Sequence, residues 1–269
     1  MCAVSTGDGV STIESWLRYA RRRTSSTRSR GSEERKGEIA VTSAVNPEEL
    51  RDQQQKWEDA FARNREMFGE EPSAAGVRAA ELFRTLGVTR ILELGAGQGR
   101  DTMFFAQSGF FVTVLDYTVE GTRWIEEKAR SLGLSDRITV IQHDIRESFP
   151  LKDDTFDACY SHMLYCMALS TEELHMLSAQ IRRVIRPRGL NVYTTRHKGD
   201  PHYGQGIHRG EDLYEVGGFV VHFFDRDKVQ DLADGYQLLD VFEFEEGRLP
   251  RRLYQVTMEK IDPPVRVNR

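Results

Sequence analysis

The sequence has few of the features that mark membrane or secreted proteins. Its longest apolar runs, such as residues 217–224, have the length of a strand, whereas a membrane-spanning helix needs roughly 20 apolar residues. The 269 residues include three cysteines, and the first residues do not have the pattern of a secretory signal. So few cysteines argue against a disulfide framework. We therefore expect a protein of the reducing cytoplasm that makes no membrane contact.

Acidic residues outnumber basic residues outside the first 45 positions. The chain has a formal net charge of −5, and residues 1–45 carry eight Lys/Arg and five Asp/Glu, so the remainder has a net charge of −8. Nucleic-acid binding depends on basic contacts to phosphates. We expect no nucleic-acid partner.

Residues 1–45 are rich in Ser, Thr, Arg and Gly, a composition that predicts a disordered tail. A transit peptide is the alternative, and Glu14, Glu33, Glu34 and Glu38 count against it. Residues 46–269 are predicted to form one domain, with a helical cap over 46–87 and a core over 88–269.

Strand-like and helix-like segments alternate in this core. Predicted strands cover 90–94, 111–116, 138–142, 156–160 and 190–195, and helices begin near Gly99, Thr118, Ser170 and Asp225. Two further strand-like runs, 236–243 and 252–259, are separated by a short turn. The pattern predicts an α/β fold: a doubly wound, mostly parallel seven-stranded sheet with helices on both faces and an antiparallel terminal hairpin. The polar segment 196–218 is predicted to be a lid inserted into this core.

A run of alternating glycines is the strongest candidate site. Gly95, Gly97 and Gly99 follow a strand that contains Glu93, and the next strand ends in Asp116. Glycine lets the backbone turn sharply and approach a ligand closely. A carboxylate at the end of the second strand can accept both hydroxyls of a ribose. Together these features predict a nucleoside-binding crevice at the carboxyl ends of the strands.

Each of these features has another interpretation. Close packing of a strand on a helix also needs glycine, and an aspartate at a strand end is often a helix cap. A dinucleotide-binding fold has the pattern G-x-G-x-x-G followed by an acidic residue about 20 positions later. Here the third glycine comes one position too early, at Gly99, and that fold predicts neither Glu93 nor Asp144 after the third strand.

These motifs resemble those of class I S-adenosylmethionine-dependent methyltransferases, over about residues 50–260. The likeness rests on residues 93–99, Asp116, Asp144 and the segment 156–161, with a further similarity at 186–190. The run 97–101 is also similar to that of the tellurite-resistance methyltransferases and relatives that act on small molecules.

The resemblance implies S-adenosylmethionine as the cofactor. Its methionine part would lie over the glycine turn, its ribose on Asp116, and its adenine beside Tyr117, Asp144 and Ile145. The predicted cofactor-binding residues are Glu93, Gly95, Gly97, Gly99, Asp116, Tyr117, Asp144 and Ile145.

The implied reaction is methyl transfer from the sulfonium to a small-molecule acceptor held in line. His162 and Tyr165 directly follow the fourth strand and are the predicted catalytic residues, as a base or as hydrogen-bond partners of the acceptor. The alternative is that they only line the pocket. The lid is predicted to bind the acceptor, through Arg196, His197, His202, Tyr203 and His208.

The lid has two other interpretations, a solvated loop or a metal site. Its histidines could bind a metal together with Glu211 and His222, but their spacing matches no tight ligand pattern, so no metal is predicted. Arg196, Lys198 and Arg209 would suit an acidic acceptor. Two other functions remain open, a sensor that binds S-adenosylmethionine without turnover and an NAD-dependent oxidoreductase.

Deletion of residues 1–45 is expected to leave the fold intact, because little in this Ser-, Thr-, Arg- and Gly-rich segment can form part of a core. Thermal unfolding of the full chain and the truncated chain should give the same midpoint. A large fall in the midpoint of the truncated chain contradicts the prediction.

Overall fold

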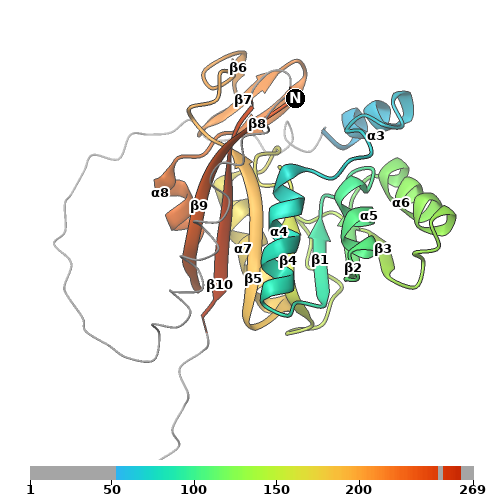
Figure 1. Cartoon of the computed structure of the whole chain (residues 1–269). Coiled ribbons are helices and arrows are strands. Elements are labelled where there is room, and N and C mark those ends of the chain that lie inside the picture. The colour runs from blue at the N-terminus through green and yellow to red at the C-terminus, as the bar shows by residue number, and fades with distance from the viewer. Residues whose placement is uncertain (1–52, 248–250, 262–269) are drawn as a thin grey trace, which may run out of the picture. The chain divides into compact units, whose positions relative to one another are not determined.

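A seven-stranded sheet forms the centre of the domain, in the order β3-β2-β1-β4-β5-β10-β9 (Figure 1). The computed structural model describes residues 53–247 and 251–261. Strands β1 to β5 run parallel, and β10 is antiparallel to both of its neighbours. The strands are β1 Arg90–Leu94, β2 Phe111–Asp116, β3 Ile138–Gln142, β4 Phe156–Ser161, β5 Ile185–Arg196, β9 Tyr236–Glu246 and β10 Arg251–Lys260. The predicted α/β fold with its antiparallel terminal hairpin is confirmed.

Helices cover both faces of this sheet because alternate strand residues point to opposite sides. Ile91 belongs to a buried cluster with residues of α4, α5 and α6, whereas Leu92 belongs to a second cluster with residues of α7 and α8. The described helices are α3 Gln53–Arg63, α4 Ala74–Thr85, α5 Arg100–Gln107, α6 Val119–Ser131, α7 Thr171–Val184 and α8 Arg226–Asp231. The predicted tail over 1–45 and the first residues, 46–52, of the predicted helical cap lie outside the described residues.

Local sequence signals set the helix starts. Helices α5, α6, α7 and α8 each begin one residue after the residue near which the sequence predicted their start. A capping box begins α7: the Ser170 hydroxyl accepts from the Glu173 N–H at 3.2 Å, and the Glu173 carboxylate accepts from the Ser170 N–H at 2.8 Å. These bonds satisfy two N–H groups that the first turn of a helix leaves free.

The inserted segment contains a small sheet that the sequence analysis did not predict. Strands β6 Ile207–His208, β7 Leu213–Val216 and β8 Phe219–His222 pair antiparallel, beyond the carboxyl end of β5 (Figure 1). Gly217 and Gly218 both have positive φ, 61° and 86°, at the turn between β7 and β8. Gly-Gly is one of the residue pairs that two-residue hairpin turns prefer, and this signal was available in the sequence.

Strand β5 begins at Ile185, five residues before the predicted start. Its first part passes through a register shift against β4, with Arg188 at φ 61°. A Cβ on Gly189 would lie 2.7 Å from the Arg186 carbonyl oxygen. Glycine is therefore required there by the close approach of the backbone.

Replacement of Ser170 by Ala removes the capping bond of α7 and should lower the free energy of unfolding by about 1 kcal/mol. Urea titration of wild type and variant measures this difference. Ser131→Ala, at the exposed end of α6, is the control and should change the midpoint much less. Equal effects of the two changes would contradict the role of the cap.

Candidate functional site

A cavity of about 370 Å³ opens at the carboxyl ends of β1, β2 and β4. Its volume falls in the usual range of roughly 300–1,000 Å³ for small-molecule sites. β1 lies between β2 and β4, so the strand order reverses beside it, where α/β sheets bind ligands. The cavity therefore lies where the sequence predicted the crevice.

The glycine turn borders this cavity with bare backbone. Gly95 and Gly97, at φ 64° and 57°, line the cavity, while Gly99, at φ 80°, precedes α5 and does not line it. A Cβ on Gly95 would lie 2.8 Å from Leu164 Cδ1, and one on Gly99 would lie 2.6 Å from Ile125 Cγ1. The first two glycines bring the main chain to the edge of the cavity, and the third allows the turn to pack against α6.

Buried carboxylates cluster around the turn. Asp116 is 4% exposed; its Oδ2 accepts from the Gly97 N–H at 2.8 Å, and its Oδ1 accepts from the Thr118 N–H at 2.9 Å and the Thr118 hydroxyl at 2.6 Å. Burial raises the pKa of Asp116, and these three hydrogen bonds oppose that shift. An ionised carboxylate can accept about four hydrogen bonds, so Asp116 keeps capacity for a ligand hydroxyl.

Glu93 has fewer hydrogen-bond partners than Asp116. Its Oε2 is buried with no hydrogen-bond partner among the described residues. Burial, followed by the nearby charge of Asp101, raises the pKa of Glu93 to about 8. A cationic group of a ligand would favour the ionised form and satisfy this oxygen.

Asp101 is a cavity residue that sequence reasoning missed. Its carboxylate accepts from the Ser73 N–H at 2.7 Å, from the Ser73 hydroxyl at 2.6 Å and from the Tyr160 hydroxyl at 3.0 Å. The signal for it was an acidic residue in the first turn of the helix that follows the glycines. Asp101 joins that helix to α4 and β4 at the wall of the cavity.

Residues after β2 and β3 line one end of the cavity. Tyr117, Asp144 and Ile145 all lie there, as predicted, together with His143. The Asp144 carboxylate pairs with the Arg146 guanidinium at 3.0 Å. Asp144 therefore faces the cavity with one cationic neighbour already in place.

Helix α3 and the residues after it close the cavity. Trp57, Phe61 and Met67 line it, and the Trp57 ring lies 4.7 Å from that of Phe219 on β8. The side chain of Gln98, inside the glycine turn, accepts from the Met67 N–H at 3.0 Å and donates to the Asn64 carbonyl at 2.7 Å. The helical segment is thus tied to the turn that it covers.

His162 is the predicted catalytic residue that the structure brings to the cavity. Its Nδ1 lies 3.0 Å from the Thr194 hydroxyl, and its Nε2 lies 3.0 Å from Glu246 Oε2. Tyr165, the other predicted catalytic residue, is fully buried, stacks on Tyr193 at 3.8 Å and does not line the cavity. The turn after β4 points His162 toward the cavity and Tyr165 into the apolar core.

The five predicted acceptor-binding residues divide in the same way. Arg196 and His202 line the cavity, whereas His197, Tyr203 and His208 do not. His197 stacks on Tyr254 at 4.5 Å, the Tyr203 hydroxyl donates to Asp212 at 3.1 Å, and a ring nitrogen of His208 lies 2.8 Å from the Glu211 carbonyl oxygen. These three side chains hold the inserted segment together.

The cations of the inserted segment are already paired with carboxylates. Arg196 donates from Nε and Nη2 to the two carboxylate oxygens of Asp200. Lys198 pairs with Asp225 at 2.6 Å, and Arg209 pairs with Glu215. An acidic acceptor would have to compete with these partners. Within residues 53–247 and 251–261, no group of three or more His, Cys, Asp or Glu is arranged to hold a metal ion.

Comparison with known proteins identifies the domain. Residues 91–189 match the family described as a methyltransferase domain. Malonyl-[acyl-carrier protein] O-methyltransferase of Pectobacterium atrosepticum is 28% identical over 134 residues, which are 49% of this chain and 48% of that protein. Residues 91–189 therefore belong to a class I S-adenosylmethionine-dependent methyltransferase domain. The chain spans about half the length of this curated relative.

Solved structures share the fold of this methyltransferase domain. The 1,6-didemethyltoxoflavin-N1-methyltransferase of Burkholderia thailandensis, solved with 1,6-didemethyltoxoflavin and S-adenosylhomocysteine, has a TM-score of 0.64 and 18% identity over 83% of this chain and 94% of that one. TehB of Haemophilus influenzae has a TM-score of 0.56 and 17% identity over 76% of this chain and 67% of that one. At these identities the likeness shows the fold.

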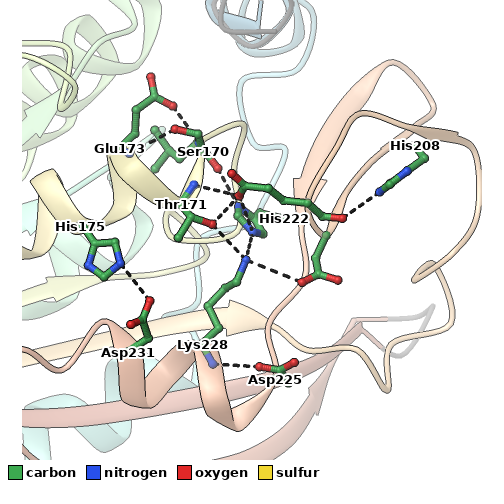
Figure 2. A network of polar contacts seen from close by, with 12 residues as sticks. Ser170, Thr171, Glu173, His175, His208, His222, Asp225, Lys228 and Asp231 are labelled. Carbon is green, nitrogen blue, oxygen red and sulfur yellow. Dashed lines mark hydrogen bonds and ion pairs between the residues drawn. The ribbon is translucent and has the colours of Figure 1, made fainter. Parts of the chain in front are cut away.

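A polar network anchors the small sheet of the methyltransferase domain to α7 and α8 (Figure 2). His222, on β8, is fully buried, with Nδ1 2.7 Å from the Leu169 carbonyl oxygen and Nε2 next to the Lys228 ammonium. Because a carbonyl only accepts, Nδ1 carries the proton and Nε2 accepts from Lys228. The Glu211 carboxylate lies 3.7 Å from His222 Nε2 and accepts from the Thr171 N–H at 2.9 Å.

This network requires a neutral His222. Burial, followed by the charge of Lys228, lowers the pKa of His222 from 6.5 to about 4. The folded protein therefore binds fewer protons than the unfolded chain between these two values, so His222 costs stability as the pH falls through that window.

The free energy of unfolding should fall as the pH decreases from about 6.5 to about 4, with His222 contributing on the order of 2 kcal/mol of that fall. Urea titrations at several pH values test this with His222→Gln, whose stability difference from wild type should be largest near neutral pH and shrink toward about pH 4. His175→Gln, at an exposed histidine of α7 paired with Asp231, is the control. A pH-independent difference for His222→Gln contradicts the assignment.

Proposed function

We propose that this protein transfers a methyl group from S-adenosylmethionine to a small-molecule acceptor. The observation that carries the proposal is the unpaired, buried carboxylate oxygen of Glu93 beside a glycine turn at the switch point of the sheet. A cationic ligand with an adenosine part fits both features. The matched methyltransferase family and the malonyl-[acyl-carrier protein] O-methyltransferase support methyl transfer, and the similarly folded 1,6-didemethyltoxoflavin-N1-methyltransferase supports a small-molecule acceptor.

The residues present fit this cofactor. Glu93 would receive its ammonium group, Asp116 its ribose hydroxyls, and the backbone of Gly95 and Gly97 would lie against its methionine part. Tyr117, Asp144 and Ile145 would surround the adenine. The sulfonium supplies an activated methyl group when bound. What the protein must add is alignment of the acceptor and exclusion of water.

The acceptor would occupy the part of the cavity beside His162. Apolar walls come from Met163, Met167 and Val221, and Arg196 and His202 lie at its edge. Helix α3 and the small sheet would keep water out while the acceptor attacks the methyl carbon in line with the departing sulfur. Tyr165 has no place in this proposal because it lies in the core.

The two other functions account for fewer of these features. A dinucleotide leaves the buried oxygen of Glu93 without a cation, and a sensor has no need of a second compartment around His162. We infer a small molecule as the partner and the cytoplasm as the setting, where Cys159 and Cys166 stay reduced. No helix among the described residues is long and apolar enough to cross a membrane.

Isothermal titration with S-adenosylhomocysteine tests the cofactor site. Wild type should bind it and should not bind NAD. Asp116→Ala should weaken binding at least about tenfold, because charge-assisted hydrogen bonds are each worth about 1.5–3 kcal/mol. Asp136→Ala, at an exposed loop residue, is the control and should bind like wild type.

Thermal unfolding shows whether Asp116→Ala still folds, and Asp116→Asn offers a milder change if it does not. No heat of binding in wild type contradicts the proposed function. Full affinity in a folded Asp116 variant contradicts the ribose assignment alone.

A further inference from the structure

Glu246, the last residue of β9, lies in the cavity beside His162. Its Oε2 is 3.0 Å from His162 Nε2. This oxygen is shielded from solvent and, His162 apart, has no hydrogen-bond partner among the described residues. Buried acceptors are normally satisfied, so the free lone pairs of Oε2 point to a ligand that brings an N–H or O–H.

Thr194 and Glu246 together determine which atom of His162 holds a proton. The Thr194 hydroxyl oxygen accepts from the Met163 N–H at 2.8 Å and lies 3.0 Å from His162 Nδ1. Because the ionised Glu246 carboxylate only accepts, the ring proton of a neutral His162 lies on Nε2, and Nδ1 accepts the proton of the Thr194 hydroxyl. In this arrangement both nitrogens of His162 are engaged, and Glu246 is the member of the pair that can take a proton.

The surroundings keep this carboxylate ionised. Arg100 Nη2 lies 3.8 Å from Glu246 Oε1, and Arg251 lines the cavity next to it. Burial alone would raise the pKa of Glu246, but His162, Arg100 and Arg251 together lower it. Glu246 is thus a charged acceptor group at neutral pH.

Aromatic side chains from the covering elements line the same cavity. Trp57 and Phe68 come from α3 and the residues after it, and Phe219 comes from the small sheet. The Trp57 ring lies 6.5 Å from Phe68 and 4.7 Å from Phe219. Such walls suit a flat apolar body, because aromatic rings stack with their centroids within about 7 Å.

We propose that Glu246 accepts the proton of an aromatic acceptor that presents an O–H or ring N–H, and that His162 is the residue that positions Glu246. This inference rests on the proposed methyl transfer. The acceptor's lone pair forms the new bond to the methyl carbon as the carbon–sulfur bond breaks, the electron pair of that bond stays on sulfur, and the acceptor's proton passes to Glu246 Oε2. The proton becomes much more acidic as the new bond forms, so a weakly basic carboxylate suffices.

The test compares Glu246→Gln with Glu245→Gln. Both changes remove one carboxylate charge from β9, but Glu245 is exposed and pairs with Arg252 outside the cavity. The acceptor probes are para-nitrophenol, a hydroxyquinoline and benzimidazole, and formation of S-adenosylhomocysteine is measured. Glu246→Gln should lower kcat about 100-fold with KM and cofactor affinity within about twofold of wild type, and Glu245→Gln should match wild type.

The pH profile separates proton transfer from a structural effect. With para-nitrophenol, the loss in Glu246→Gln should disappear at a pH where the phenol is already ionised, because no proton then remains to be taken. A structural defect would lower the rate at every pH.

Three outcomes overturn the inference while leaving methyl transfer intact: full activity of Glu246→Gln, an equal loss at every pH, or no turnover of any probe by a protein that binds S-adenosylhomocysteine. Failure of wild type to bind S-adenosylhomocysteine counts instead against the proposed function itself.

Discussion

The hydrogen bond from the Gly97 N–H to the Asp116 carboxylate joins the ends of β1 and β2, and the site is arranged around it. It holds the glycine turn against the sheet and leaves the turn's backbone facing the cavity. The same carboxylate binds Thr118, which precedes α6. Gln98, one residue further along the turn, binds the segment that covers the cavity. The buried carboxylate of Asp116 therefore holds the glycine turn in place, and Gln98 of that turn holds the segment after α3 over the cavity.

The buried carboxylates differ in their hydrogen-bond partners and in the direction of their pKa shifts, and this difference distinguishes a structural carboxylate from a candidate ligand-binding one. Asp157 accepts from the Thr89 and Arg90 N–H groups and pairs with Arg186. Burial alone would raise its pKa, but these partners lower it. One oxygen of Glu93, Oε2, has no partner among the described residues, and burial raises the pKa of Glu93 despite the opposing effect of Thr102. An unpartnered carboxylate oxygen is costly in an apolar site, so a cationic ligand would complete the environment of Glu93.

The inserted segment combines a polar anchor with an apolar inner wall. Lys198, Arg209 and Lys228 bind carboxylates or the neutral His222, which fixes the small sheet on α7 and α8. The side of the sheet that faces the cavity presents Phe219 and Val221. Its charged residues therefore hold the small sheet in place, and its apolar residues line the part of the cavity proposed for the acceptor.

The sequence by itself determined the order of strands and helices, the glycine turn and the acidic residue at the end of β2, because periodicity, caps and turns act within about ten residues. The paired glycines at 217–218 also marked a hairpin locally. Tertiary structure decided which polar residues share one cavity. It placed Asp101 and Glu246 beside the predicted site, and it turned Tyr165, His197, Tyr203 and His208 away from the cavity. Those positions depend on packing between segments as far apart in the sequence as His162 and Glu246. They also depend on which cationic side chain pairs with which carboxylate in the folded chain. No local sequence pattern encodes the packing or the pairing.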